Sequence, residues 1–272
     1  MSNLNEQIKE LSTGNGYFVI PQLFSAEQVK QARDIIMEKS AEADKVTHFQ
    51  GKNNDKLALQ RRVWNLLNKG DIFVDMVQHP QIVELVGKFL GSEFCLGSIA
   101  ANRILPGGPG QEPHIDYPYW DMHKRESFPS NMNASFPMNC QVTIMLDEFS
   151  HESGATAILP ESQNLCRYPS EEDEKMFYDK AARITGQPGD VAVFFGMTWH
   201  CAMPNNSDHD RTGVLIQYLP KFIKPMEDQQ RGVKQEVINN ASPVLKQLLG
   251  FDFPYPQILE EAQGGNTEGR VT

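Results

Sequence analysis

Short apolar runs rich in β-branched residues fill the chain from about residue 95 to about residue 220, and they constrain its fold more than any other feature. Clusters of Gly, Pro, Asn and Asp separate these runs. Strands this short, with turns this frequent, are typical of an antiparallel barrel or sandwich. The sequence therefore predicts a mainly β core over 95–220, with strands at 97–105, 140–146, 156–159, 190–195 and 212–219.

The first third of the chain, 1–94, has a different texture and is expected to be mainly helical. Ser25 and Gln28 form a capping box ahead of apolar residues at helical spacing, which predicts a helix to about Ala43. A second helix is expected over 80–90, and one or two more over 60–78.

Three further segments complete the expected organisation. A short apolar run at 16–21 predicts a strand that ends at a proline. Residues 221–272 are expected to form a helical extension and a polar tail. Because no repeat or low-complexity linker divides the chain, we expect residues 1–272 to form a single domain.

The composition excludes several classes of protein. A formal net charge of −10, without a basic cluster, argues against a nucleic-acid partner. We see neither a signal-peptide pattern nor an apolar stretch long enough to span a membrane. The four cysteines are scattered and form no CxxC pair, so reduced thiols in a cytoplasmic protein are expected. The sequence says nothing about oligomeric state.

A His-x-Asp motif, His114-Ile115-Asp116, lies at the start of the β region's long central segment. If it is extended, its imidazole and carboxylate project from the same face. They would supply two of the three ligands of a facial triad, which suits iron(II) with open positions for oxygen and a co-substrate. A single His-x-Asp pair is weak evidence without such a context.

Residues that support a metal site at this motif lie near the other end of the β region. His200 follows a turn and an apolar strand, and it is the natural third metal ligand. Arg211 stands eleven positions further on, across a turn, so its guanidinium is expected to enter the same interior. A planar, permanently charged fork binds a carboxylate through two hydrogen bonds. 2-Oxoglutarate carries such a carboxylate at the end remote from its metal-chelating group.

The segment 106–139 is long, irregular and rich in Pro, Gly, Asn and aromatic residues, which favours a functional loop such as a lid or substrate wall. Substrate-contact candidates are Tyr117, Tyr119 and Trp120, which could equally pack the barrel mouth. Arg103 is a candidate for gripping an acidic substrate, although a solvated charge is the simpler interpretation.

Together these motifs resemble those of the phytanoyl-CoA dioxygenase family of iron(II)- and 2-oxoglutarate-dependent oxygenases. The similarity covers most of the chain. The run from Leu146 to Pro160 also resembles the family's Asn-Gly-x-Leu…Pro-Gly-Ser-His segment, but here it ends in Pro160-Glu161-Ser162-Gln163. The principal matches are His114-Ile115-Asp116, Gly189-Asp190-Val191, Trp199-His200 and the Pro204-Asn205-x-Ser207 turn before Arg211.

The resemblance implies a double-stranded β-helix, or jelly roll, with flanking helices and iron at one end. It implies that 2-oxoglutarate and O2 are consumed and that succinate and CO2 are released. By position, Asn102 resembles a 2-oxoglutarate contact, and Gln141 is a candidate for either 2-oxoglutarate or substrate. Since related halogenases replace the carboxylate ligand with a small residue, Asp116 favours hydroxylation, desaturation or dealkylation.

The sequence does not identify the substrate. We expect a small metabolite or natural-product intermediate, as in secondary metabolism, because no basic cluster would receive the phosphates of a CoA ester. Two alternatives stay open. One is a non-catalytic jelly-roll module that binds a metal or small ligand. The other is a metal-dependent cupin-like enzyme that does not use 2-oxoglutarate.

Overall fold

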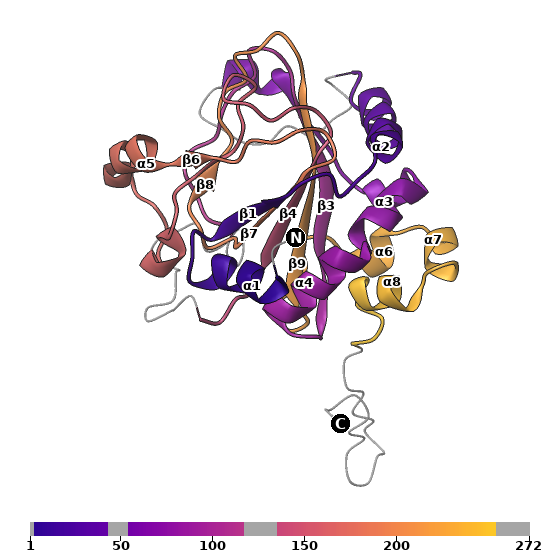
Figure 1. The fold of residues 1–272 in the computed structure, drawn as a ribbon. Coiled ribbons are helices and arrows are strands. Elements are labelled where there is room, and N and C mark those ends of the chain that lie inside the picture. Colours follow the sequence, from indigo (N-terminus) through magenta and orange to yellow (C-terminus); the bar gives the residue numbers. More distant parts are fainter. Residues whose placement is uncertain (1–2, 43–53, 117–134, 254–272) are drawn as a thin grey trace.

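Two antiparallel sheets with helices packed around them make up the fold (Figure 1). The computed structural model describes residues 3–42, 54–116 and 135–253. The larger sheet has the strand order β1-β7-β4-β9-β3-β2 and the smaller has the order β6-β5-β8. This is the jelly-roll arrangement with flanking helices that the sequence predicted. The larger sheet contains β1 (Tyr17–Ile20), β2 (Gln60–Val63), β3 (Phe94–Ile104), β4 (Cys140–Met145), β7 (Val191–Phe194) and β9 (Arg211–Pro220); the smaller contains β5 (Ala157–Ile158), β6 (Ala182–Arg183) and β8 (His200–Cys201).

Helices occupy both ends of the described chain and some of its loops. No helix within the described residues is long and apolar enough to cross a membrane. The α-helices are α1 (Leu4–Ser12), α2 (Ala26–Lys39), α3 (Asp71–Val77), α4 (Pro80–Leu90), α5 (Glu174–Lys180), α6 (Gln229–Gly232), α7 (Gln235–Asn239) and α8 (Pro243–Leu248). Short 3-10 helices are η2 (Asn54–Leu59), η3 (Leu66–Asn68), η6 (Ser162–Leu165) and η7 (Glu171–Asp173).

The two faces of the larger sheet have different partners because side chains alternate along each strand. The outer face carries Val142, Val193 and Ile216, which belong to one core cluster with the helices. On this face the Tyr218 hydroxyl donates to the carbonyl of Val77 at the end of α3 (2.7 Å). Helix α4 crosses the outer face, as Figure 1 shows. The apolar outer face therefore anchors the helical layer and leaves the inner face for the site.

The inner face is partly apolar and partly polar. Met145, Ala192 and Phe194 form a small apolar cluster there with Phe149 and Ile158 from the opposite side. Amide and guanidinium side chains occupy other inner positions, including Asn102, Gln141 and Arg211, all buried. Buried polar groups are costly unless they find partners, so an inner face of this kind indicates a ligand site.

Most of the elements predicted from sequence are confirmed. The capping box of Ser25 and Gln28 opens α2, although the helix ends at Lys39. The strand at 16–21 and the helix at 80–90 are present as β1 and α4. All five predicted core strands occur within a few residues of their expected bounds. All four cysteines are free thiols, as expected.

The prediction that residues 60–78 are helical is wrong for the first four. Gln60–Val63 form β2, which pairs with β3 from Gln60 opposite Ile104 to Val63 opposite Ala101. Pairing with an open sheet edge overrides the local pattern here, and α3 begins only at Asp71. Helix α5 and strand β6 were not anticipated. Part of the predicted 106–139 loop, residues 117–134, lies outside the described residues; the described flanks contain no regular element except a β-bridge at His114.

Glu161 occupies a conformation that suits glycine, in the turn where the related segment has Pro-Gly-Ser-His. Its φ of 63° lies in the left-handed region. That conformation costs an ordinary residue about 1–2 kcal/mol, while glycine loses roughly 0.5–1 kcal/mol more backbone entropy on folding. We therefore expect Glu161→Gly to raise the free energy of unfolding by about 0.5–1 kcal/mol, measured by urea denaturation.

The matched control is Glu171→Gly, in the first turn of η7, where the backbone is helical. This change should lower stability by a similar amount, because a helical position gains nothing from glycine. Equal effects of the two substitutions, in sign and size, would contradict the conformational explanation.

Candidate metal centre

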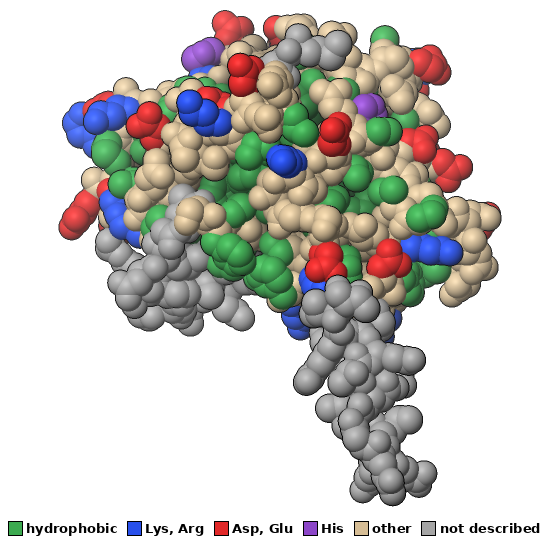
Figure 2. Space-filling view, turned by 60° about the horizontal axis from the view of Figure 1, so that its bottom comes forward, with side chains coloured by type: hydrophobic (Ala, Val, Ile, Leu, Met, Phe, Trp, Pro, Cys, Tyr) green, Lys and Arg blue, Asp and Glu red, His purple; other side chains and the backbone are tan. Residues whose placement is uncertain are grey.

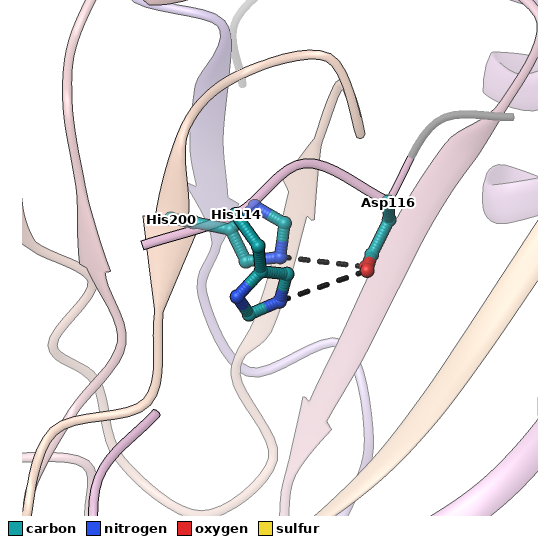
Figure 3. A group of neighbouring side chains, drawn as sticks. All are labelled: His114, Asp116 and His200. Atoms are coloured by element: carbon teal, nitrogen blue, oxygen red, sulfur yellow. Dashed lines mark ion pairs between the residues drawn. The ribbon is translucent and has the colours of Figure 1, made fainter. Parts of the chain in front are cut away.

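Three side chains from two distant segments meet at one end of the inner face: His114, Asp116 and His200 (Figure 3). His114 and His200 form an isolated antiparallel bridge in which each backbone N–H donates to the other's carbonyl at 3.0 Å. Asp116 continues this pairing, since its N–H donates to the carbonyl of Gly196 (2.9 Å). The backbone thus fixes which side chains face each other.

The donor atoms of the three residues converge. His114 Nε2 lies 3.7 Å from Asp116 Oδ1, and His200 Nε2 lies 3.4 Å from Asp116 Oδ2. One donor atom from each residue lies within 4.8 Å of the other two, close enough for one ion to contact all three. His200 is almost fully buried, whereas the Asp116 side chain keeps 37% of its surface exposed. Two imidazoles and one carboxylate on one side of an ion leave other positions open for ligands.

Backbone carbonyls orient both imidazole rings. Nδ1 of His114 lies 2.7 Å from the carbonyl oxygen of Glu112, and Nδ1 of His200 lies 2.9 Å from that of Thr198. A carbonyl can only accept, so each Nδ1 carries a proton, and in the neutral imidazole Nε2 keeps its lone pair. Both lone pairs therefore face Asp116, and the residues present fit a divalent metal.

Burial and neighbouring charges both shift the pKa values of His114, Asp116 and His200. Burial alone would raise the pKa of Asp116, but the neighbouring His200 and His114 lower it to about 2. Burial, and then repulsion from His200, lower the pKa of His114 to about 4. Burial opposes protonation of His200 as well, yet the Asp116 carboxylate raises its pKa above the ordinary value. Asp116 is therefore ionised and His114 neutral near pH 7, the states that bind a cation.

Asn139 holds the backbone of Asp116 in place. Its buried carboxamide donates through Nδ2 to the Asp116 carbonyl and accepts from the N–H of Gly196 (3.0 Å). This side chain ties the segment that carries Asp116 to the end of β7. Sequence reasoning missed it, because a single Asn before a strand gives no local signal.

Arg211 lies at the start of β9, on the inner face, and is buried. Its Nη1 donates to the carbonyl of Gly154, and its guanidinium carbon lies 5.0 Å from the ring centre of Phe149. Nε has no hydrogen-bond partner, and no carboxylate of a described residue pairs with the group. Burial, and then repulsion from Arg183, lower its pKa to about 10, so it remains charged at neutral pH. A buried cation without a counterion favours binding of an external anion.

The turn ahead of Arg211 is built as its sequence suggested. Asn205 is buried, and its Nδ2 donates to the carbonyls of Ile104 (3.0 Å) and His209 (2.8 Å). Its Oδ1 accepts from the N–H and the hydroxyl of Ser207. Gly154, with a φ of +81°, lets the turn ahead of β5 approach the backbone of Met203 and Pro204. These contacts fix where β9 starts, and therefore where Arg211 points.

The other predicted site residues have different positions. Asn102 and Gln141 face the inner side of the sheet, and Asn102 Oδ1 is buried without a hydrogen-bond partner. Arg103 does not join them: it points to the opposite face, where it pairs with Asp210 (2.7 Å) and contacts Ser40. The prediction that Arg103 grips substrate is wrong because adjacent strand residues face opposite sides. Tyr117, Tyr119 and Trp120 lie outside the described residues.

Two inner-face residues were not anticipated. Arg62 on β2 pairs in register with Asn102, and its guanidinium carbon lies 4.9 Å from the ring centre of Trp64. Burial lowers the pKa of Arg62 to about 10, against the opposing effect of the Asp116 and Glu227 carboxylates. Phe194 packs its ring against that of His200, with centres 4.8 Å apart. Phe194 therefore contacts one of the three converging residues, and Arg62 acts electrostatically on another.

The family model of phytanoyl-CoA dioxygenase (PhyH) matches residues 13–213, which include all three converging residues and Arg211. The chain therefore belongs to the phytanoyl-CoA dioxygenase family, a class of 2-oxoglutarate-dependent non-haem iron oxygenases. This confirms the resemblance inferred from the motifs, and with it iron(II) and 2-oxoglutarate as the cofactors of the class.

Several curated dioxygenases are similar to the chain. A probable α-ketoglutarate-dependent hypophosphite dioxygenase of Stutzerimonas stutzeri is 27% identical, with 89% of each chain covered. The dioxygenase trt7 of Aspergillus terreus is 23% identical over 73% of this chain. The chain spans 66%, 60% and 56% of the lengths of trt7, andF of Emericella variicolor and cdmD of Talaromyces verruculosus.

Solved structures show the same fold at low sequence identity. The epimerase SnoN, crystallised with Fe3+, α-ketoglutarate and a nogalamycin compound, superposes with a TM-score of 0.60 at 16% identity. The match covers 82% of this chain and 86% of that one. A second SnoN structure gives a TM-score of 0.62, also at 16% identity. This similarity supports the jelly-roll assignment.

The contact between Asn139 and Asp116 can be broken selectively. Asn139→Asp keeps the acceptor for Gly196 but replaces the donor that faces the Asp116 carbonyl. We expect iron(II) affinity to fall about 10–100-fold, the usual effect of losing an outer-sphere partner of a metal ligand. Anaerobic equilibrium dialysis against a competing chelator measures this affinity.

Asn68 offers a control with the same hydrogen-bonding pattern. It donates to the Gly232 carbonyl (2.7 Å) and accepts from the Lys234 N–H (2.8 Å), away from the three converging residues. Asn68→Asp should lower stability without changing iron affinity. If both variants lose iron affinity equally, the Asn139 contact has no specific role in positioning Asp116.

Proposed function

We propose that the protein is an iron(II)- and 2-oxoglutarate-dependent oxygenase that hydroxylates, desaturates or dealkylates a small molecule, with release of succinate and CO2. One observation carries the proposal: the converging His114, Asp116 and His200 share the interior of the jelly roll with a buried guanidinium, Arg211, that has no carboxylate partner among the described residues. A metal site alone would not need that buried charge.

His114, Asp116 and His200 would hold the iron, with Nε2 of each imidazole and the Asp116 carboxylate as donors. Once bound, iron(II) and 2-oxoglutarate would activate O2, which is the oxidant for breaking an unactivated C–H bond, while 2-oxoglutarate is oxidised to succinate and CO2. The chain's own contribution is orientation. The Glu112 and Thr198 carbonyls hold the imidazole tautomers, and Asn139 holds the backbone of Asp116.

Arg211 would bind the remote carboxylate of 2-oxoglutarate. Its contact with the Gly154 carbonyl uses Nη1, so Nη2 and the unpartnered Nε remain for two parallel hydrogen bonds. Asn102 would contact the same molecule through its Nδ2 donor, since it faces the same side of the sheet as Arg211. The carboxylate of Asp116 fills the position that halogenases leave open, which supports oxygenation rather than halide transfer.

The substrate we propose is a small metabolite or natural-product intermediate. The similar dioxygenases include a probable hypophosphite dioxygenase, and the SnoN structure holds a nogalamycin compound, so this fold serves small molecules of very different size. A CoA ester is disfavoured. On the face in Figure 2, Lys and Arg side chains are scattered singly or in small groups among acidic ones. We also propose a cytoplasmic location, on the composition alone.

The two alternatives from the sequence are less well supported. A non-catalytic binding module gives no reason for a family match that spans residues 13–213. A cupin-like enzyme that does not use 2-oxoglutarate gives no reason for the buried charge of Arg211. Both alternatives predict that Arg211 substitutions leave 2-oxoglutarate binding unaffected.

Arg211→Lys tests the co-substrate assignment, because lysine keeps the charge but loses the bidentate fork. We expect the KM for 2-oxoglutarate in uncoupled succinate formation to rise about tenfold or more, the effect of losing one charge-assisted hydrogen bond. The control is Arg103→Lys. The guanidinium that this variant loses pairs with Asp210 on the opposite face of the sheet. An unchanged KM in Arg211→Lys would contradict the assignment.

A further inference from the structure

A row of polar side chains crosses the inner face of the larger sheet next to the metal centre. Gln141 on β4 is opposite Phe194 on one side and Gln217 on the other. Gln217 in turn is opposite Ser98 on β3. Because directly opposed residues lie on one face, these side chains form a continuous row that begins at the Phe194 ring, against His200.

The two carboxamides in this row belong to buried residues and have no hydrogen-bond partner in the described part of the chain. Gln141 is 7% exposed and Gln217 is 6% exposed. Neither side chain forms a hydrogen bond with any residue of 3–42, 54–116 or 135–253. Most buried amides are hydrogen-bonded, so two unpartnered amides side by side call for an external partner.

The backbone of β3 makes room for this arrangement. The register between β3 and β9 shifts between Leu96 and Ser98, which places a bulge at Gly97. A Cβ at Gly97 would lie 2.5 Å from Gln217 Oε1, so any larger residue would displace that amide. Bulges of this kind often re-aim side chains next to active sites.

We propose that Gln141 and Gln217 form the specificity-determining contact for the primary substrate, and that the substrate is a polar small molecule that offers a hydroxyl, carbonyl or amide group to this pair. Each carboxamide can both donate and accept, so the pair selects for hydrogen-bonding groups and against a bare hydrocarbon chain. The assignment of this side of the site to substrate rests on the proposed function.

A pair of probes of similar size and shape tests this directly: cyclopentanol and methylcyclopentane, each titrated into the 15N-labelled Zn(II)·2-oxoglutarate form of the full chain. The side-chain NH2 signals of the pair are identified by their loss in Gln141→Leu and Gln217→Leu. We expect cyclopentanol to shift both signals, and its Kd to rise about fivefold in each Leu variant. The signal of the buried Gln163, which already donates to the Gly14 carbonyl, should not move.

Gly97→Ala provides a second variant that leaves both glutamines in place. It should weaken cyclopentanol binding because the added Cβ would crowd Gln217 Oε1, and with it the side chain of Leu219, but would not touch Gln141. The proposal is overturned if methylcyclopentane shifts the wild-type signals as strongly as cyclopentanol, if neither probe shifts them at millimolar concentration, or if the Leu variants bind cyclopentanol unchanged. The Zn(II) form does not turn over, so a failed succinate assay would count against the proposed function and leave this result standing.

Discussion

The backbone bridge between His114 and His200 is the interaction on which the site depends. It joins a loop that precedes β4 to the short strand β8, segments far apart in the chain, through two reciprocal hydrogen bonds. The bridge sets the two imidazoles face to face and leaves Asp116, two residues on, beside both of them. Because a shift of one residue would turn the His114 and Asp116 side chains away from the interior, pairing register determines whether a metal site exists.

The larger sheet separates stability from chemistry. Its outer face buries aliphatic side chains and Tyr218 against the helices, where apolar burial stabilises the fold. This leaves the inner face able to carry buried polar groups that reduce stability. Arg211 and the carboxamides of Asn102, Gln141 and Gln217 are the clearest examples. A bound co-substrate and substrate would satisfy these groups, so their cost is offset when the protein works.

Local pattern was sufficient to predict the strands and the residues that converge at the candidate metal centre. Apolar runs between turn residues marked β3, β4, β7 and β9, and the His114-Ile115-Asp116 motif reads as two side chains on one face. The turn built by Asn205 and Ser207 was also visible, because such residues form turns through contacts within a few positions. In these places the sequence and the tertiary structure agree.

What escaped prediction depends on partners that are distant in the chain. Strand β2 exists because β3 offers an edge, and Asn139 and Gln217 matter because of the residues opposite them. The wrong prediction for Arg103 has the same cause. Asn102 and Arg103 were both placed in the site, although neighbours on one strand must face opposite sides. Choosing between them required the register with β9, which no local pattern reveals.

The most direct test is succinate formation from 2-oxoglutarate by the protein loaded anaerobically with iron(II) and then exposed to air, compared between wild type and His200→Ala. Uncoupled turnover makes this measurement possible without the primary substrate. If His114, Asp116 and His200 hold the iron, wild type forms succinate and the variant, which lacks one of the three donors, forms none. Equal succinate formation by both proteins, or none by a wild type that binds iron tightly, would contradict the assignment.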